Sequence, residues 1–455
     1  MRVVIIGAGQ VGSAITATLA GEKADVVAVD TVEDRLKELR DLHDIQTICG
    51  SGSNPVILSE AGVESADMIV AVTDSDEVNM VAAAIAGMKA PHAIKVARIR
   101  ETALVRDTDI LGPKGFKVDH PINPELVAAK RIAEIVRVPV ASDVAECGPG
   151  LNLVGLRLPE GSPVEGYTFA QLRALTPDLK VLAATRVRGG ETIVPRGTDD
   201  LRAGDTLYLV VDPEDLPGVA AMFHLTWRPT KRVTIAGGTG IGALVAGDLE
   251  KEGKLQIKLI ESNPKRAVEL AESFDRVLVL QGSPTDESLL LEENIRDCDV
   301  FIAALPEEEA NVMAALNAKR LGAHRVIALT NKLSYVPIIE NAGVDAVVST
   351  RALAIGTMLQ HVRKGKVKAV IPYGDLGQAE AIEFEALETA PAVGKPLKDV
   401  GFPEGAIVGV LIRDGEALIP GGNDIVMPGD HVFVFAHKKA IPKIEKLMSV
   451  KLDFF

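Results

Sequence analysis

Residues 3–12 read VVIIGAGQVG and residues 233–242 read VTIAGGTGIG, so one pattern occurs twice at an offset of 230 positions. In both stretches an apolar strand runs directly into a glycine loop, and a helical stretch follows. Two further segment pairs match: 66–83 with 298–315 at an offset of 232, and 195–210 with 420–435 at an offset of 225. Repeats at such spacing indicate that the chain is an internal duplication, with small insertions placed in loops.

The matched positions include polar residues. Asp67 lies opposite Asp299, and Asn79 lies opposite Asn311. In the last pair of segments the matches are Pro195, Gly197, Asp199, Gly204 and Asp205 with Pro420, Gly422, Asp424, Gly429 and Asp430.

Each half changes character midway. Apolar strands at 3–6, 25–29, 46–49, 68–72 and 94–97 alternate with helical stretches, which predicts a doubly wound parallel sheet. Residues 124–136 read as one helix with Pro124 in its first turn. Between about 150 and 212 the strands follow one another closely, as in a small, mostly antiparallel sheet. The second half repeats this order, with a helix near 351–363 and a joint between the halves at 226–230.

The predicted fold class is therefore α/β, with two Rossmann-like doubly wound parallel-sheet domains that are each followed by a small β-rich α+β domain. The expected limits are 1–120 and 231–348 for the parallel-sheet domains, and 137–225 and 368–455 for the small domains.

The bulk composition excludes several classes of protein. Of the 455 residues only 4% are aromatic, and the formal charge is −14, which argues against binding nucleic acid. The three cysteines, Cys49, Cys147 and Cys298, form no C-x-x-C pair, which disfavours disulfides and zinc and favours a reducing cytosol. The chain begins with a strand and a glycine loop, so we expect no signal peptide, and no apolar run reaches the roughly 20 residues of a membrane span.

The first glycine loop has the spacing G-x-G-x-x-G. It consists of Gly7, Ala8, Gly9, Gln10, Val11 and Gly12. In a Rossmann-type phosphate loop the first glycine makes the tight turn, the second lets a pyrophosphate approach, and the third lets the helix pack on the strand. Free amides at the helix start then face the phosphate charge. The alternative is a loop of this shape that serves only as a structural turn.

Three strand ends place polar side chains near this loop. Asp30 lies 30 − 9 = 21 residues after Gly9, where a carboxylate accepts both ribose hydroxyls and disfavours the extra phosphate of NADP. NAD(H) is therefore the predicted ligand, although Asp30 as a loop acid or helix cap stays open. Thr73 and Asp74 follow the strand at 68–72, and Arg98 follows the strand at 94–97. Spacing alone leaves Arg98 open between a phosphate contact and a surface ion pair.

The second loop has a different composition. It consists of Gly237, Gly238, Thr239, Gly240, Ile241 and Gly242, with Thr239 at the position of the middle glycine. The β-carbon of Thr239 is expected to crowd a pyrophosphate. Glu261 keeps the acid after the second strand, whereas Leu305 and Pro306 replace Thr73 and Asp74, and Thr330 replaces Arg98. This site is expected to bind another nucleotide, to bind weakly, or to be structural.

The sequence contains no recognisable catalytic set. The eight histidines lack metal spacing, and there is no G-x-S-x-G, H-E-x-x-H or Walker motif. We therefore predict a protein that is not an enzyme, with no catalytic residues and no metal site. The alternative is an NAD-dependent oxidoreductase whose catalytic residue is not recognised.

The whole chain resembles the TrkA family, the cytosolic NAD-binding regulatory subunits of bacterial Trk potassium-uptake systems, built from paired RCK domains. Its most specific features are GAGQVG (7–12), Asp30, VTDSDEVNM (72–80), and the paired segments 195–205 and 420–430. The resemblance implies that Gly7 to Val11, Asp30, Thr73, Asp74 and Arg98 hold a nucleotide. It implies the same of Gly237 to Ile241 and Glu261 in the second half, where Thr239 departs from the family pattern.

The resemblance also implies a function. NAD(H) is expected at the first site, and ATP, ADP or a second NAD at the second. Family members assemble as rings of RCK units, so we expect a homotetramer that docks under a TrkH/TrkG-like membrane subunit at the cytoplasmic face. Bound nucleotide would then gate potassium transport allosterically. Which nucleotide activates, and in which direction the gate moves, are not implied.

Overall fold

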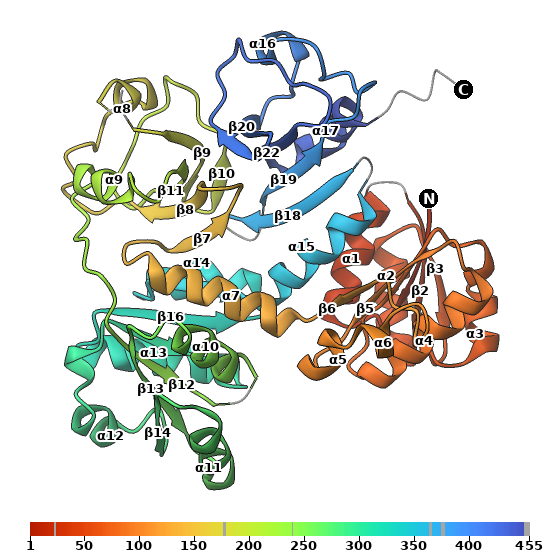
Figure 1. The fold of residues 1–455 in the computed structure, drawn as a ribbon, viewed down its shortest axis with the longest axis horizontal. Coiled ribbons are helices and arrows are strands. Elements are labelled where there is room, and N and C mark those ends of the chain that lie inside the picture. The colour runs from red at the N-terminus through yellow and green to blue at the C-terminus, as the bar shows by residue number, and fades with distance from the viewer. Residues whose placement is uncertain (22–23, 176–178, 239, 364–365, 375–377, 450–455) are drawn as a thin grey trace. The chain divides into compact units, whose positions relative to one another are not determined.

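The structure is a computed structural model that describes residues 1–455 apart from 22–23, 176–178, 239, 364–365, 375–377 and 450–455 (Figure 1). The strands of the described residues form four sheets, two with six strands and two with five. The chain divides into two compact units, one of residues 1–127 with 353–363 and one of residues 128–352 with 364–455. Each unit is described by itself.

The first sheet is doubly wound and parallel. Its strands are β1 (Arg2–Ile6), β2 (Asp25–Asp30), β3 (Gln46–Cys49), β4 (Met68–Ala71), β5 (Ile94–Arg98) and β6 (His120–Ile122), in the order β3-β2-β1-β4-β5-β6. The connecting helices are α1 (Gln10–Gly21), α2 (Glu33–Leu42), α3 (Pro55–Glu60), η1 (Val63–Ser65), α4 (Asp76–Lys89), α5 (Thr102–Arg106) and α6 (Thr108–Leu111), and α7 (Pro124–Arg137) follows. The five predicted strands are confirmed. The three-residue β6 lies outside that prediction because it is too short to show a pattern.

The second six-stranded sheet repeats this topology. It contains β12 (Arg232–Ala236), β13 (Gln256–Glu261), β14 (Val277–Gln281), β15 (Val300–Ala303), β16 (Arg325–Thr330) and β17 (Ala346–Ser349), in the order β14-β13-β12-β15-β16-β17. Its helices are α10 (Ile241–Glu250), α11 (Pro264–Ser273), α12 (Glu287–Glu292), η2 (Ile295–Asp297), α13 (Glu308–Leu321), η3 (Leu333–Tyr335) and α14 (Val336–Asn341). The predicted duplication and fold class are confirmed.

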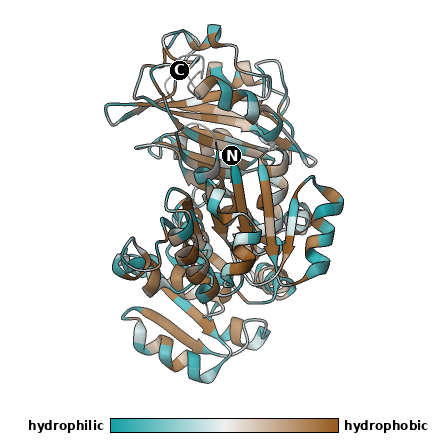
Figure 2. Cartoon of the chain, turned by 90° about the vertical axis from the view of Figure 1, so that its right-hand side faces the viewer, coloured by the Kyte–Doolittle hydropathy of each residue, from teal (hydrophilic) through white to brown (hydrophobic). Residues whose placement is uncertain are grey.

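The central strands are apolar because helices cover both faces of each parallel sheet. Val3, Val4, Ile5 and Ile6 of β1 are each at most 1% exposed, and Figure 2 shows such strands in the hydrophobic colour. The repeated aspartates accept hydrogen bonds at the amino ends of the first strands of the two sheets. Asp67 accepts a hydrogen bond from the Arg2 backbone N at 2.7 Å, and Asp299 accepts from the Arg232 backbone N at 2.9 Å.

The two small sheets are antiparallel, as predicted. The first has β7 (Asp143–Glu146), β8 (Asn152–Arg157), β9 (Val181–Arg188), β10 (Glu191–Ile193) and β11 (Thr206–Val211), with α8 (Phe169–Leu175) and α9 (Leu216–Met222). The second has β18 (Val367–Tyr373), β19 (Ala379–Glu385), β20 (Ala406–Arg413), β21 (Glu416–Leu418) and β22 (His431–His437), with α16 (Leu397–Val400), η5 (Lys438–Ala440) and α17 (Ile441–Met448).

These two small sheets share one apolar core. Val210 and Tyr208 of β11 lie in the same buried cluster as Tyr373 of β18 and Phe435 of β22. The Tyr373 hydroxyl lies 2.8 Å from the Thr185 hydroxyl, so the one polar atom that Tyr373 brings into the core has a partner. Burial raises the pKa of the Tyr373 phenol, which therefore stays neutral.

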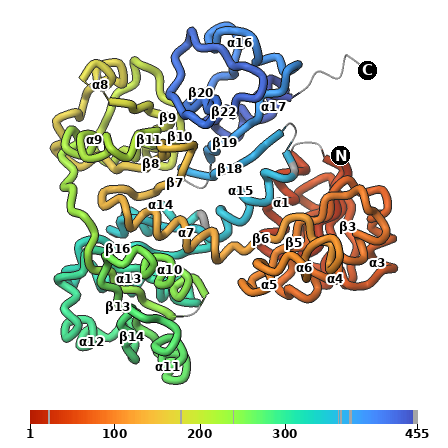
Figure 3. Tube along the Cα trace, in the orientation of Figure 1, coloured from red at the N-terminus to blue at the C-terminus, as the bar shows by residue number. Residues whose placement is uncertain are grey.

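Helix α15 (Thr350–Val362) confirms the predicted helix near 351–363 but packs where the sequence gave no indication. Met358 is fully buried in the core that contains Val3 and Ile15 of the first sheet domain. The His361 ring stacks on the His120 ring of β6 with centroids 3.8 Å apart. Burial and the neighbouring His120 lower the pKa of His361 to about 4. Figure 3 shows α15, in cyan, beside α1.

A buried ion pair explains the repeated PRGTDDLRAGD and PGGNDIVMPGD segments. Asp205 is fully buried and accepts two hydrogen bonds from the Arg188 guanidinium, at 2.6 and 2.7 Å. Asp430 accepts the same pair from Arg413 at 2.9 and 2.7 Å. The preceding glycine has a left-handed backbone in both modules, with φ of 83° at Gly204 and 86° at Gly429. These repeated residues therefore build the turn before the last strand of each small sheet.

Replacing Asp205 with Asn is expected to destabilise the first small domain by about 3 kcal/mol, because it leaves the Arg188 charge without its buried carboxylate. Differential scanning calorimetry of the full chain measures this as a lower melting temperature. Asp414→Asn, at an exposed turn residue with φ of 53°, is the matched control and is expected to change stability by less than about 0.5 kcal/mol. Equal melting temperatures for the two variants would contradict the structural role of the pair.

Candidate functional site

The first glycine loop lies at the carboxyl edge of β1, where the sheet order reverses between β1 and β4. Gly7 has φ of 104°, and a β-carbon there would lie 2.9 Å from the Thr73 backbone N. A β-carbon on Gly12 would lie 1.8 Å from the Gly7 carbonyl oxygen, so α1 packs directly on the turn. A β-carbon on Gly9 would meet nothing within 4 Å. The loop is therefore tightly packed at Gly7 and Gly12 and open at Gly9.

Asp30 holds this loop through its carboxylate. Its Oδ2 accepts a hydrogen bond from the Ala8 backbone N at 2.6 Å, and its Oδ1 accepts from the Val32 backbone N at 2.8 Å. Arg35 lies 3.7 Å from Oδ2, and Asp30 itself is only 8% exposed. A carboxylate has about four acceptor positions, so two remain for other donors. Asp30 therefore both caps the following turn and supports the loop.

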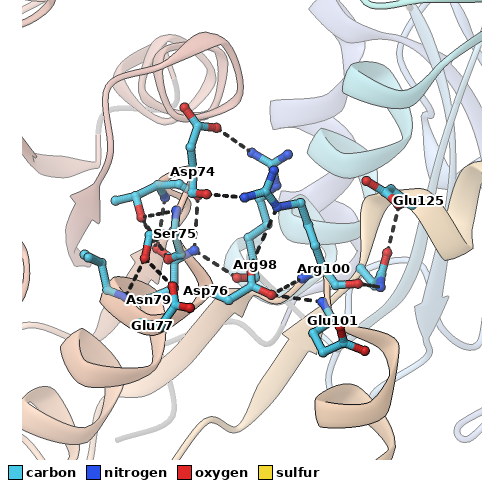
Figure 4. A network of polar contacts seen from close by, with 12 residues as sticks. Asp74, Ser75, Asp76, Glu77, Asn79, Arg98, Arg100, Glu101 and Glu125 are labelled. Carbon is cyan, nitrogen blue, oxygen red and sulfur yellow. Dashed lines mark hydrogen bonds and ion pairs between the residues drawn. The ribbon is translucent and has the colours of Figure 1, made fainter. Parts of the chain in front are cut away.

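A buried asparagine joins the ends of β4 and β5 (Figure 4). Asn79 of α4 is fully buried, and its Oδ1 accepts from the Thr73 backbone N at 2.9 Å and from the Thr73 hydroxyl at 2.8 Å. Its Nδ2 donates to the Arg98 carbonyl at 2.9 Å. The sequence marked Asn79 only as a repeated residue, and the repeat with Asn311 was the one signal of its importance.

The charged residues at these strand ends form one exposed network. Arg98 pairs with Asp74 at 3.3 Å, and the Nε of Arg98 is buried without a partner among the described residues. Asp76 accepts hydrogen bonds from the Arg100 and Glu101 backbone N atoms at 2.8 and 2.9 Å, and the Arg100 guanidinium donates to the Asp74 carbonyl. Figure 4 shows how these side chains gather at the carboxyl edge. Asp76 and Arg100 were not predicted from the sequence.

The predicted residues of the first half thus lie at one edge of one sheet. Gly7, Ala8, Gly9, Gln10, Val11 and Gly12 form the loop and the start of α1, and Asp30 is bonded to the loop. Thr73 adjoins Gly7, and Asp74 and Arg98 pair next to Thr73. Gln10 is exposed, whereas Val11 packs against the sheet core.

The second loop is held in the same manner. Glu261 accepts a hydrogen bond from the Gly238 backbone N at 2.9 Å, from the Asn263 backbone N at 2.7 Å and from the Ser262 hydroxyl at 3.4 Å. A β-carbon on Gly242 would lie 1.9 Å from the Gly237 carbonyl oxygen, which reproduces the close packing of the first loop. Ile241 begins α10 after Gly240. Thr239 lies outside the described residues.

The sheet register corrects one sequence assignment. Ala97 pairs with Ala71 in the first sheet, and Ala328 pairs with Ala303 in the second. Asn79 donates to the carbonyl of Arg98, whereas its counterpart Asn311 donates to the carbonyl of Leu329. Leu329 therefore occupies the position of Arg98, and the assignment of Thr330 to it was wrong by one residue. The offset between the repeats changes from 232 at β15 to 231 at β16, because the helix-to-strand loop is one residue shorter.

The edge of the second sheet is more apolar than that of the first. Leu305 replaces Thr73, and its Cδ2 would lie 3.2 Å from a β-carbon on Gly237. The Leu270 side chain would lie 2.4 Å from a β-carbon on Gly238. The nearby polar groups pair with one another: the Thr330 hydroxyl donates to Glu308 at 3.0 Å and Lys332 pairs with Glu309 at 3.2 Å.

Among the residues described, no group of three or more His, Cys, Asp or Glu side chains is placed to hold a metal ion. Within the same residues, no helix is long and apolar enough to span a membrane.

The fold and the loops define a class of protein with two Rossmann-type domains in tandem, each followed by a small antiparallel domain. The TrkA-N domain model matches residues 3–124 and 233–350, and the TrkA-C domain model matches residues 153–224 and 381–449. Together these matches cover most of the chain. The chain therefore belongs to the TrkA family.

Relatives match over the whole length. The Trk system potassium uptake protein TrkA of Halomonas elongata is 37% identical over 460 residues, covering 100% of both chains. The protein of the same name from Azorhizobium caulinodans is 36% identical over 459 residues, again with 100% of both chains covered.

Solved structures have the same fold at low identity. The GsuK channel bound to NAD has a TM-score of 0.59 at 15% identity, covering 98% of this chain and 78% of that one. The structure of GsuK bound to ADP has a TM-score of 0.50 at 14% identity, covering 79% and 68%. Identity at this level shows the fold alone.

Alanine is expected to affect stability differently at the last and at the middle glycine of the first loop. Gly12→Ala is expected to cost about 1–3 kcal/mol, because its methyl group meets the Gly7 carbonyl and the helix or turn must shift. Gly9→Ala faces open space and is expected to change stability by less than about 0.5 kcal/mol. Thermal unfolding of both variants without ligand measures the difference. A Gly12→Ala variant as stable as Gly9→Ala would show that the described loop packing is wrong.

Proposed function

We propose that this protein is a peripheral cytosolic regulatory subunit of a potassium-uptake transporter, which binds NAD(H) at its first glycine loop. The observation that carries the proposal is the full-length match to Trk system potassium uptake proteins, at 37% identity over 460 residues, in a chain whose first glycine loop is intact. In this proposal the ranges 1–120 and 137–225 form the N-terminal and C-terminal parts of a first RCK domain, and the ranges 231–348 and 368–455 form those of a second.

The geometry of the first loop supports NAD(H) as its ligand. Open space at Gly9, next to the start of α1, leaves room for a pyrophosphate to approach the backbone there. Asp30 keeps two acceptor positions after bonding Ala8 and Val32, which suits the two hydroxyls of a ribose. Arg98 and Asp74 would then lie beside the remainder of the nucleotide. A structural neighbour bound to NAD is consistent with this assignment.

The second loop is proposed to hold ATP, ADP or a second NAD with fewer polar contacts, through Gly237 to Ile241 and Glu261. Glu261 already accepts three hydrogen bonds, and Leu305 and Leu329 stand where the first half has Thr73 and Arg98. Fewer donors and acceptors reduce the differential affinity for any nucleotide, so the first site is expected to respond more strongly.

The proposed mechanism is allosteric gating, without a catalytic step. Four chains would supply eight RCK units for a ring that docks under a TrkH/TrkG-like membrane subunit. A nucleotide shifts such an assembly only if it binds one state more tightly than the other. The Asn79 bonds carry a displacement at Thr73 to β5 and Arg98, and Asp76 carries it to the backbone after β5. These bonds connect the carboxyl edge of the first sheet, where the nucleotide is proposed to bind, to the backbone that follows β5.

Asp30→Ala is expected to weaken NADH binding about tenfold or more, because it removes a charged hydrogen-bond partner worth about 1.5–3 kcal/mol. Calorimetric titration of NADH into the full chain measures the effect. Glu261→Ala is the matched control, since it removes the equivalent acid of the second half, and it is expected to leave the high-affinity NADH site unchanged. Unchanged NADH affinity in Asp30→Ala would remove the basis of the site assignment.

Expression of this chain with its cognate membrane subunit is expected to restore potassium uptake to a bacterial strain that lacks its own uptake systems. Asp30→Ala is expected to alter the uptake rate, because the gate no longer responds to NAD(H), whereas Asp414→Asn is expected to behave as wild type. Steady NADH consumption by the purified chain with a carbonyl substrate would instead favour an oxidoreductase.

A further inference from the structure

A cavity of about 380 Å³ lies in the second unit, and no residue of either glycine loop lines it. Its wall combines elements of both halves: the segment after α7, the ends of β8 and β11, the joint at Leu225 and Thr226, and the starts of β16 and β17. The polar side chains in this wall include those of Ser142, Arg157, Lys319, His324, Arg325 and Asp345. Glu340 also contributes to the wall.

Basic side chains outnumber acidic side chains in the wall of this cavity. Lys319 bonds both carboxylate oxygens of Asp345, at 2.9 and 2.7 Å, so these two charges cancel. Arg325 is only 7% exposed, and its guanidinium donates to the uncharged carbonyls of Val138 and Ala141. Arg157, which is exposed, donates to the carbonyl of Glu340 at 3.5 Å. After the pairing of Lys319 with Asp345, the charged groups left in the wall are two guanidinium groups and the Glu340 carboxylate, and the hydrogen bonds of the two guanidinium groups go to backbone carbonyls.

Burial is the main cause that lowers the pKa of two groups in the wall, and nearby cations add to it at His324. Burial lowers the pKa of His324, and the cations Arg228, Lys319 and Arg325 lower it further, against an opposing effect of Asp345. Burial also lowers the pKa of Arg325 to about 10, with Asp345 again opposing. An anion in the cavity would raise the pKa of both groups, because a nearby negative charge favours their protonated forms.

The first half has no such cluster at the equivalent place. In the sheet register Ile94 of β5 occupies the position of Arg325, since Ile94 pairs with Met68 and Arg325 pairs with Val300. The acid there, Asp119, pairs with Lys95 at 2.8 Å. The two halves therefore differ at this matched position, with an apolar residue in the first half and a buried arginine in the second. A residue that only begins a strand has no need of a buried positive charge.

We propose that this cavity binds a small oxyanion, a phosphate group carried either as the free ion or as a small monoester. Arg325 and Arg157 offer guanidinium N–H donors, which match the oxygens of a phosphate in pairs. The His324 ring offers a further N–H donor in the same wall, whereas the Ser142 hydroxyl donates to the Gly155 carbonyl at 3.2 Å. The volume of about 380 Å³ accommodates a phosphate with a short organic group attached.

Occupation of this cavity would tie together the two halves of the chain within the second unit. Arg157 belongs to the first small sheet, and His324 and Arg325 begin a strand of the second parallel sheet. The joint residues Leu225 and Thr226 lie between them in the same wall. A bound anion that both sides contact would favour the arrangement in which these elements surround the cavity. It would therefore act as an effector separate from the nucleotide sites.

Calorimetric titration of the full chain with inorganic phosphate and, separately, with glycerol 3-phosphate tests the proposal. Both probes, or one of them, are expected to bind at millimolar concentrations or below, and the stronger probe identifies the free ion or the monoester as the natural class. Arg157→Glu is expected to weaken binding about tenfold or more, as loss of one charge-assisted hydrogen bond implies. Arg157 is exposed, so this variant is expected to fold.

Two further variants complete the test. Arg276→Glu, an arginine of the same unit outside the cavity wall, is the matched control and is expected to bind phosphate as wild type does. His324→Gln is expected to weaken binding and to remove the increase in affinity that wild type shows when the pH falls toward the pKa of His324. No binding of either probe to the wild type, or equal binding to Arg157→Glu, would overturn the proposal. NADH affinity is expected to be unchanged in all variants, so a failure here is distinct from a failure at the glycine loop.

Discussion

In each half of the chain a carboxylate at the end of the second strand accepts a hydrogen bond from the backbone N–H of the second loop residue. The bonds are Ala8 to Asp30 at 2.6 Å and Gly238 to Glu261 at 2.9 Å. Both acids are at most 8% exposed, and a buried N–H without a partner costs free energy. The acid is therefore needed to shape the loop whether or not a ligand is present. It follows that an acid at this place is weaker evidence for a bound ribose than its spacing suggests.

This constraint explains why the second half kept Glu261 while its neighbours changed. Glutamate is one methylene longer than aspartate, yet it reaches the same N–H and also bonds Asn263 and Ser262. Around it, leucines replace the polar residues at the ends of β15 and β16. The loop scaffold is thus conserved within the chain, whereas the surface that a nucleotide would contact is not. Leu305 and Leu329 are two of the described residues that make the second edge less polar than the first.

Periodicity and repetition predicted the two parallel sheets, the two small antiparallel sheets and the helix near 351–363, because apolar strands and glycine loops leave a strong local pattern. They did not predict that Met358 of α15 enters the core of the first sheet domain. An apolar helix face indicates only that it needs a partner, and the choice among several cores depends on contacts between distant segments. The one-residue error at Thr330 has a similar origin, since a repeat offset cannot locate a deletion inside a loop. The predicted polar residues of the first half do gather at one edge, but Asn79, which organises that edge, carried no chemical motif.

Comparison of the two halves of the chain distinguishes two kinds of residue. Identical residues at matched positions form bonds within the scaffold: Asn79 and Asn311 join neighbouring strands, and Asp205 and Asp430 each hold an arginine. Residues that differ at matched positions lie on surfaces where a ligand could be contacted, as with Thr73 against Leu305. The change from Ile94 to Arg325 belongs to this second kind, and it introduces a buried charge that the fold of the first half does without. Because burial of a charge is costly, such a change persists only where the charge has a partner or a task. The carbonyls of Val138 and Ala141 accept its hydrogen bonds, and its one acidic neighbour, Asp345, is already paired with Lys319, so the cavity beside Arg325 has room for a further anion.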